Sequence, residues 1–149
     1  NRTKPLNQSE VAALVNVNTQ NSLQLATAIR YGNYDKALGL VADLINRNEP
    51  ALKIVATLVG QFRTWAIVKL KLEAGEKDEK IIATAAEVSN PKRIYFLRQD
   101  VQLLCSHQLL ATLPILLALE FHLKRGADPL ATLQTKIIEL CHLFKPSQM

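Results

Sequence analysis

The segment PALKIVATLVGQFRTWAIVKLKLEAG, residues 50–75, decides the fold of this chain. Proline is favoured at the first position of a helix, as Pro50 would be, and glycine is favoured just after its end, as Gly75 would be. The spacing therefore predicts one long helix between them. At 100° per residue its apolar side chains cover most of the circumference. Such a thin polar stripe predicts a central helix that neighbours pack on nearly every side. The stripe holds Lys53, Thr57, Gly60, Thr64 and Lys71.

The rest of the chain shows the same helical period. Hydrophobic residues make up 48% of the 149 residues, glycines number only 5, and apolar residues recur at helical rather than alternating spacing. A chain of this length buries a sizeable core without disulfides or metal. The sequence therefore predicts an all-α protein, a compact multi-helix bundle of about eight helices with short connections.

Capping residues and breakers set the expected boundaries of these helices. Asn7, with Glu10 three residues later, is typical of a helix start, and a polar break is expected over residues 16–21. Asn33 caps the helix expected over 34–47, after one over 23–31. Pro114 is expected to kink or split the helix that starts at 106. The remaining helices are expected over 78–88, 92–105 and, after the cap Asp128, 129–144, with a frayed tail over 145–149.

Charge and cysteine content limit the classes of partner and the cellular compartment that are expected. The net charge of +5 and the pI of about 9.4 favour acidic partners but are moderate for a dedicated nucleic-acid binder. Aromatic residues, at 5%, are not expected to interleave with basic ones as a single-strand platform requires. Two cysteines and an N-terminus without an apolar signal region predict a reducing, cytoplasmic setting. Charges interrupt the apolar runs, so no membrane partner is expected.

Sequence motifs for catalysis are missing. The chain has no phosphate loop of the GxxxxGK[ST] type, no dinucleotide fingerprint and no GxSxG elbow. Its histidines and cysteines lack the spacing of zinc ligands, and its acidic residues give no readable acid/base pair. We predict no catalytic residue, no cofactor and no metal site. The residues considered for zinc or a nucleophile pair are His107, His122, His142, Cys105 and Cys141.

The segment EKIIATAAEVSNPKRIYFLRQ, residues 79–99, resembles a helix-turn-helix. In that interpretation Lys92, Arg93 and Arg98 on the second helix would face a major groove of DNA. Glu87 departs from the pattern, because such turns usually hold glycine. The alternative is two packed helices with a solvated basic edge.

Lys69 lies on the apolar face of the long helix, and three interpretations are open. A buried ammonium would need a carboxylate neighbour, because leaving it unpaired costs several kcal/mol. A catalytic lysine would need a pocket that nothing else in the sequence indicates. The favoured interpretation is that the stem covers apolar surface, including the packed aromatics Phe62 and Trp65, while the ammonium emerges to solvent or a partner.

The order of these segments resembles a known family. GQFRTWAIVK, residues 60–69 after EPALKIVATLV, is similar to a helix in the C-terminal domain of the delta subunit of bacterial DNA polymerase III, the clamp-loader subunit that opens the sliding clamp. The resemblance continues in SLQLATAIRYGNYDKAL, residues 22–38, in residues 79–99, and in LPILLALEFHLKRGADPLATLQTKIIEL, residues 113–140. It spans about residues 23–140.

The resemblance implies a noncatalytic collar domain, the helical module through which clamp-loader subunits join in a pentameric ring. Expected partners are the delta-prime and ATPase (tau/gamma) subunits, with the sliding clamp reached only through N-terminal domains and DNA indirectly. Residues 1–19 would end a preceding small helical lid domain, and 20–149 would form the collar. Arg63, Lys69 and Lys124 become candidate interface or structural residues. The parent assembly would be a DNA-directed DNA polymerase, a nucleotidyltransferase.

Overall fold

A computed structural model describes residues 7–145, with the side chain of Val15 left out, and within them seven α-helices and no strand. The all-α bundle is therefore confirmed. The expected frayed tail lies, apart from Lys145, outside the described residues. The helices are α1 (Gln8–Arg30), α2 (Tyr34–Asn46), α3 (Ala51–Glu73), α4 (Glu79–Ala86), α5 (Arg93–Val101), α6 (Ser106–Lys124) and α7 (Pro129–Phe144).

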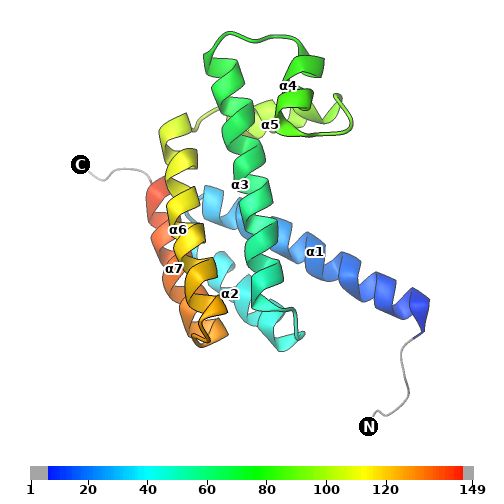
Figure 1. Cartoon of the computed structure of the whole chain (residues 1–149), viewed down its shortest axis with the longest axis vertical. Coiled ribbons are helices and arrows are strands. Elements are labelled where there is room, and N and C mark those ends of the chain that lie inside the picture. Colours follow the sequence, from blue (N-terminus) through cyan, green and yellow to red (C-terminus); the bar gives the residue numbers. More distant parts are fainter. Residues whose placement is uncertain (1–6, 146–149) are drawn as a thin grey trace.

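Helix α3 is the central element, as its apolar circumference predicts. It contacts α1, α4, α5 and α6 (Figure 1). Helix α6 lies alongside its first half and middle with α7 packed on α6, α1 crosses it, and the short pair α4 and α5 covers its C-terminal end. Its buried side chains form the middle of the core, and they are Ile54, Val55, Leu58, Phe62, Trp65, Ala66 and Val68.

The expected polar break over residues 16–21 is wrong, because α1 runs unbroken from Gln8 to Arg30. Asn18 and Ser22 are buried rather than exposed in a turn. The Asn18 side-chain amide donates to the Glu49 carboxylate in the loop before α3, at 3.3 Å. A tertiary partner for a polar side chain thus replaces the expected turn. Two expected helices merge, which gives seven instead of about eight.

Most predicted caps are confirmed. The side chains of Asn7, Asn33 and Asp128 each accept a hydrogen bond from a backbone N–H two or three residues into their helices. Pro50 is the cap of α3 rather than its first helical residue, a shift of one position. Gly32 closes α1 with φ +68°, and a Cβ there would lie 3.4 Å from the backbone of Lys145, so the turn packs tightly on the end of α7.

Pro114 does not split α6, which continues through it to Lys124. Proline leaves the carbonyl four residues earlier, on Leu110, without its helical donor. Pro114 and Leu110 are both exposed, so they lie on the solvent side of the helix, where that carbonyl is open to hydrogen bonding by water.

Helix α3 is long and apolar enough to cross a membrane by length and composition, and so is the bent pair α5 and α6 taken as one segment, within residues 7–145. The expectation that charge keeps every run too short is therefore wrong for α3. Seven side chains of α3 are nevertheless buried inside the bundle, as in the core helix of a globular domain.

Candidate functional site

Helix α6 carries an exposed apolar stripe, which we define as Leu110, Pro114, Leu117 and Phe121. These residues are spaced i, i+4, i+7 and i+11, so they fall within about 60° of the helix circumference. Leu117 is 65% exposed and Phe121 54%. Large apolar side chains aligned in this way on one helix face are typical of a surface that another helix covers.

The opposite face of α6 packs into the core. Leu109, Leu116 and Leu119 are completely buried there, against α3 and α7. The helix is therefore apolar on both sides, although within residues 7–145 only one side packs against other helices. The sequence analysis missed the stripe, and the signal that would have found it is a second set of leucines at helical spacing beside the core set.

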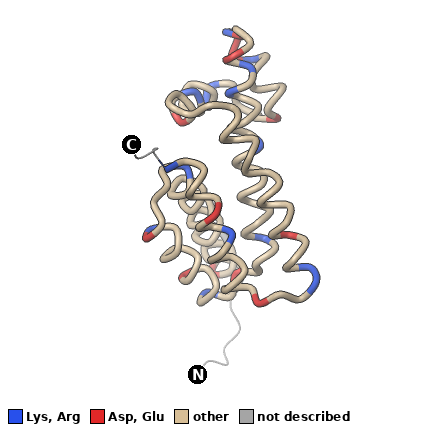
Figure 2. Tube along the Cα trace, turned by 90° about the vertical axis from the view of Figure 1, so that its left-hand side faces the viewer, with Lys and Arg blue, Asp and Glu red and all other residues tan. Residues whose placement is uncertain are grey.

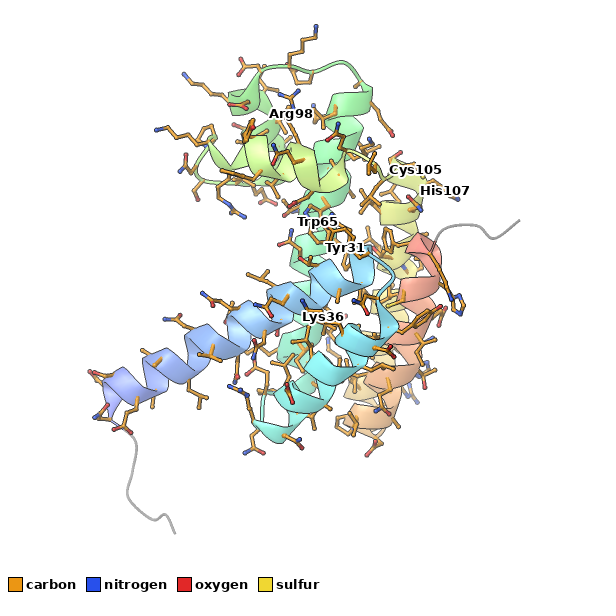
Figure 3. The ribbon with its side chains drawn as sticks, turned by 180° about the vertical axis from the view of Figure 1, so that it is seen from behind. Tyr31, Lys36, Trp65, Arg98, Cys105 and His107 are labelled. Carbon is orange, nitrogen blue, oxygen red and sulfur yellow. The ribbon has the colours of Figure 1, made fainter. Side chains whose placement is uncertain are left out.

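An ion pair and an indole hydrogen bond connect three helices near the middle of α3. The Trp65 indole N–H donates to the Asp100 carboxylate on α5 at 3.2 Å. Arg30 of α1 donates to the Asp100 backbone carbonyl at 2.9 Å, and its guanidinium lies 3.8 Å from the same carboxylate. Figure 3 labels Trp65 and Tyr31 where α1 crosses α3, and Arg30 stacks over both rings. This network fixes α5 against the body.

The three candidate interface residues lie in different parts of the molecule and have different partners. Arg63 pairs with Glu87 at 2.6 Å, across α3 and the end of α4, and both side chains are largely exposed. Lys124 lies 3.7 Å from Glu120 within α6. Lys69 is half-buried near the end of α3, and its ammonium donates to the Gln102 carbonyl at 3.5 Å. Exposed pairs of this sort contribute little to stability, about 0–1 kcal/mol each.

The structure brings Lys92 and Arg98 to one pocket but places Arg93 elsewhere. Arg93 lines a pocket with Trp65 and Asp100, whereas Arg98 lines another with Lys69. Five residues of helix separate the two arginines by about 140°. Lys92 precedes the helix and is exposed. Binding of all three in one major groove stays an untested prediction.

Aromatic residues do interleave with these basic residues, contrary to the expectation from composition. Tyr95 and Phe96 follow Arg93 on α5 and are 56% and 63% exposed. Their rings meet edge to face with centroids 5.2 Å apart. The low aromatic content of the whole chain concealed this local pattern.

Glu87 adopts the left-handed conformation that glycine usually supplies, with φ +59° and ψ +37° at the end of α4. In the helix-turn-helix pattern this position usually holds glycine. A side chain in this region costs about 1 kcal/mol. The ion pair of Glu87 with Arg63 gives the exposed carboxylate a fixed position across the turn.

The cysteines and histidines are dispersed. Cys105 and His107 lie at the start of α6 (Figure 3), whereas Cys141 is buried in α7. Burial raises the pKa of the Cys141 thiol to about 11, so it is protonated at neutral pH. His142 contacts the Tyr34 hydroxyl at 3.1 Å. Within residues 7–145 no three His, Cys, Asp or Glu side chains are grouped as metal ligands would be.

Residues 19–140 match the family model described as "DNA polymerase III delta subunit, C-terminal domain". The chain belongs to this family. A solved structure, the DNA clamp loader delta protein (YqeN) of Bacillus subtilis, is similar at 25% identity with a TM-score of 0.71. A search of curated proteins found no match.

The match to the Bacillus subtilis structure covers 84% of this chain and 37% of that one. The delta C-terminal domain described here therefore spans little more than a third of that relative. The family match covers the second half of α1, all of α2 to α6 and most of α7, and it agrees with the resemblance noted in the sequence.

Proposed function

We propose that this delta C-terminal domain is a noncatalytic assembly module of a bacterial clamp loader, in which it joins the helical collar formed by the other subunits. The observation that carries the proposal is the exposed apolar stripe of α6. Family membership supplies the biological setting, and the Bacillus subtilis clamp loader delta protein supports it. In this proposal residues 20–149 form the collar domain and residues 1–19 end a preceding lid domain.

The stripe has the chemistry of a helix-docking surface. Burying a leucine or phenylalanine side chain stabilises an interface by about 1.5–3 kcal/mol. Charged residues flank the C-terminal end of the stripe, where Glu120 and Lys124 lie close together and the Arg125 guanidinium stacks 5.1 Å from the Phe121 ring. An apolar centre with a charged rim is the usual anatomy of a protein–protein interface.

The proposed partners are the delta-prime and ATPase (tau/gamma) subunits, each through its own collar domain. Contact with the sliding clamp belongs to regions outside this chain, and contact with DNA through the assembly is indirect. Polymerisation, the nucleotidyltransferase step, belongs to the polymerase holoenzyme. This role places the domain in the cytoplasm.

Association with the full-length delta-prime and ATPase subunits tests the proposal. Size-exclusion chromatography should show this chain eluting with them. Leu117→Glu should weaken that association by at least about tenfold, because the interface would bury an unpaired carboxylate. Circular dichroism should show an unchanged fold, since residue 117 is exposed.

Leu52→Glu is the matched control. Leu52 is 41% exposed in the first turn of α3, outside the α6 stripe, and the substitution adds the same charge. It should change the association by less than about twofold, as surface changes outside an interface do. If wild-type chain and partners fail to co-elute, or if Leu52→Glu and Leu117→Glu act equally, the proposal is wrong.

A further inference from the structure

A basic pocket lies at the C-terminal end of α3, between that helix, the following loop and α5. Its volume is about 510 Å³, within the usual range for ligand pockets. Three cationic side chains line it, Lys69 from α3, Lys77 from the loop and Arg98 from α5, together with Tyr95 and Gln99. Figure 3 labels Arg98 at this end of the molecule.

These three cations have no carboxylate partner among the described residues. The ion pairs found within residues 7–145 involve other side chains, and Lys69 donates only to the Gln102 carbonyl. Glu76 is the single acidic residue in the lining. One of its oxygens accepts hydrogen bonds from the backbone N–H groups of Lys77 and Asp78, both at 3.1 Å. The pocket therefore has excess positive charge that an anion would compensate.

The positive surface continues into a neighbouring pocket. Lys77 and Arg98 line both pockets, and Lys80 and Lys92 line the second one. Two carboxylates lie there as well, but Asp78 accepts from the Lys80 backbone N–H as the cap of α4. Figure 2 shows lysines and arginines, with acidic residues between them, at the end formed by α4 and α5. Because the two pockets share Lys77 and Arg98, they form one continuous basic surface that is longer than a single small anion.

Tyr95 adds a stacking surface at this path. It lines the same pocket as Lys69 and Arg98, is 56% exposed, and its ring meets the Phe96 ring in a T-shaped arrangement. Cations that follow a backbone, with an exposed aromatic ring beside them, are what single-stranded nucleic acid requires. Double-stranded DNA offers phosphates but no free base face for the ring.

We propose that Lys69, Lys77 and Arg98 bind the phosphates of a single-stranded nucleic acid while Tyr95 stacks on one of its bases. This site is separate from the α6 stripe and does not depend on the collar proposal. The positively charged residues lie on α3, α5 and the loop between α3 and α4, so the strand would pass over the end of the bundle. It also gives Lys69 a role for its solvent-directed ammonium.

Fluorescence anisotropy with a labelled oligothymidylate and the full 149-residue chain tests this proposal. We expect binding that weakens with salt, with a slope near 0.7 for each phosphate contacted. The triple variant Lys69→Met, Lys77→Met, Arg98→Met should lower affinity by at least about tenfold and reduce the salt slope, because it removes three phosphate contacts together. Tyr95→Ala should lower it by at least about fivefold.

Lys53→Met is the matched control for Lys69→Met, because Lys53 lies on the same helix, is exposed and has no carboxylate partner among the described residues. It should change affinity by less than about 1.5-fold. Three results would overturn the proposal: no binding at low salt, equal losses from Lys53→Met and Lys69→Met, or equal affinity for polyglutamate. Binding to a duplex of the same length at equal strength would also overturn it. Circular dichroism checks that each variant is folded.

Discussion

Helices α3 and α6 are both largely apolar but have different surroundings. Both are apolar on most of their circumference, yet α3 is contacted by α1, α4, α5 and α6, whereas α6 is contacted by α3 and α7. The remaining face of α3 holds its polar stripe, and the remaining face of α6 holds Leu110, Leu117 and Phe121. An apolar face indicates that something covers it, but only the structure tells whether the cover comes from the same chain.

Removing the aromatic centre of α3 should have the largest effect. Trp65→Ala should lower the free energy of unfolding by about 3–5 kcal/mol, because it leaves a cavity and removes the indole hydrogen bond to the Asp100 carboxylate. Urea denaturation followed by circular dichroism measures the loss. Trp65→Phe keeps most of the ring volume and should cost clearly less, so equal losses would contradict the cavity explanation.

Adjacent leucines on α6 compare its two faces directly. Leu116 is completely buried and Leu117 is 65% exposed. Leu116→Ala should lower the free energy of unfolding by about 2–5 kcal/mol, and Leu117→Ala by less than about 0.5 kcal/mol. Both variants delete the same atoms, so the difference reports burial alone. Similar losses in the isolated chain would mean that the stripe is covered by this chain itself.

Gly60 tests whether the polar stripe of α3 is open to solvent. A Cβ at this position meets nothing within 4 Å. Gly60→Ala should therefore raise the free energy of unfolding by about 0.5–1 kcal/mol through helix propensity. Gly32→Ala is the contrasting variant and should destabilise, because Gly32 has φ +68° and close backbone neighbours. A destabilising Gly60→Ala would show that the stripe is covered.

Lys69→Met should have the smallest effect on stability. It keeps the stem and deletes an ammonium that has a single long hydrogen bond, to the Gln102 carbonyl. We expect the free energy of unfolding to change by less than about 0.5 kcal/mol. A loss above about 3 kcal/mol in a denaturant titration would instead indicate a buried ion pair.

Local signals in the sequence were sufficient for much of the fold. The period of residues 50–75 identified the central helix, and Asn7, Asn33 and Asp128 identified helix starts because a cap acts within one turn. Glu87 was recognised as a position that favours glycine, and it does adopt a left-handed conformation. Phe62 and Trp65 were expected in the core and are buried.

The errors concern interactions between residues distant in sequence. The break expected at residues 16–21 failed because Asn18 reaches Glu49, 31 residues away. The contact of Arg30 and Trp65 with Asp100 connects three helices, and no local pattern contains it. The basic pocket was harder still to predict, because its cations on α3 and α5 meet only after α4 folds back. The spacing of the α6 stripe can be recognised in the sequence, but its exposure cannot.

Site-specific photocrosslinking from the stripe tests the collar proposal most directly. A benzophenone amino acid at position 117 of this chain, in a clamp loader assembled with full-length delta-prime and ATPase subunits, should crosslink to one of those subunits on illumination. The same group at position 52 serves as the control and should not. Crosslinking at both positions alike, or at neither while the assembly is intact by size exclusion, would contradict the assignment of the α6 stripe as the subunit interface.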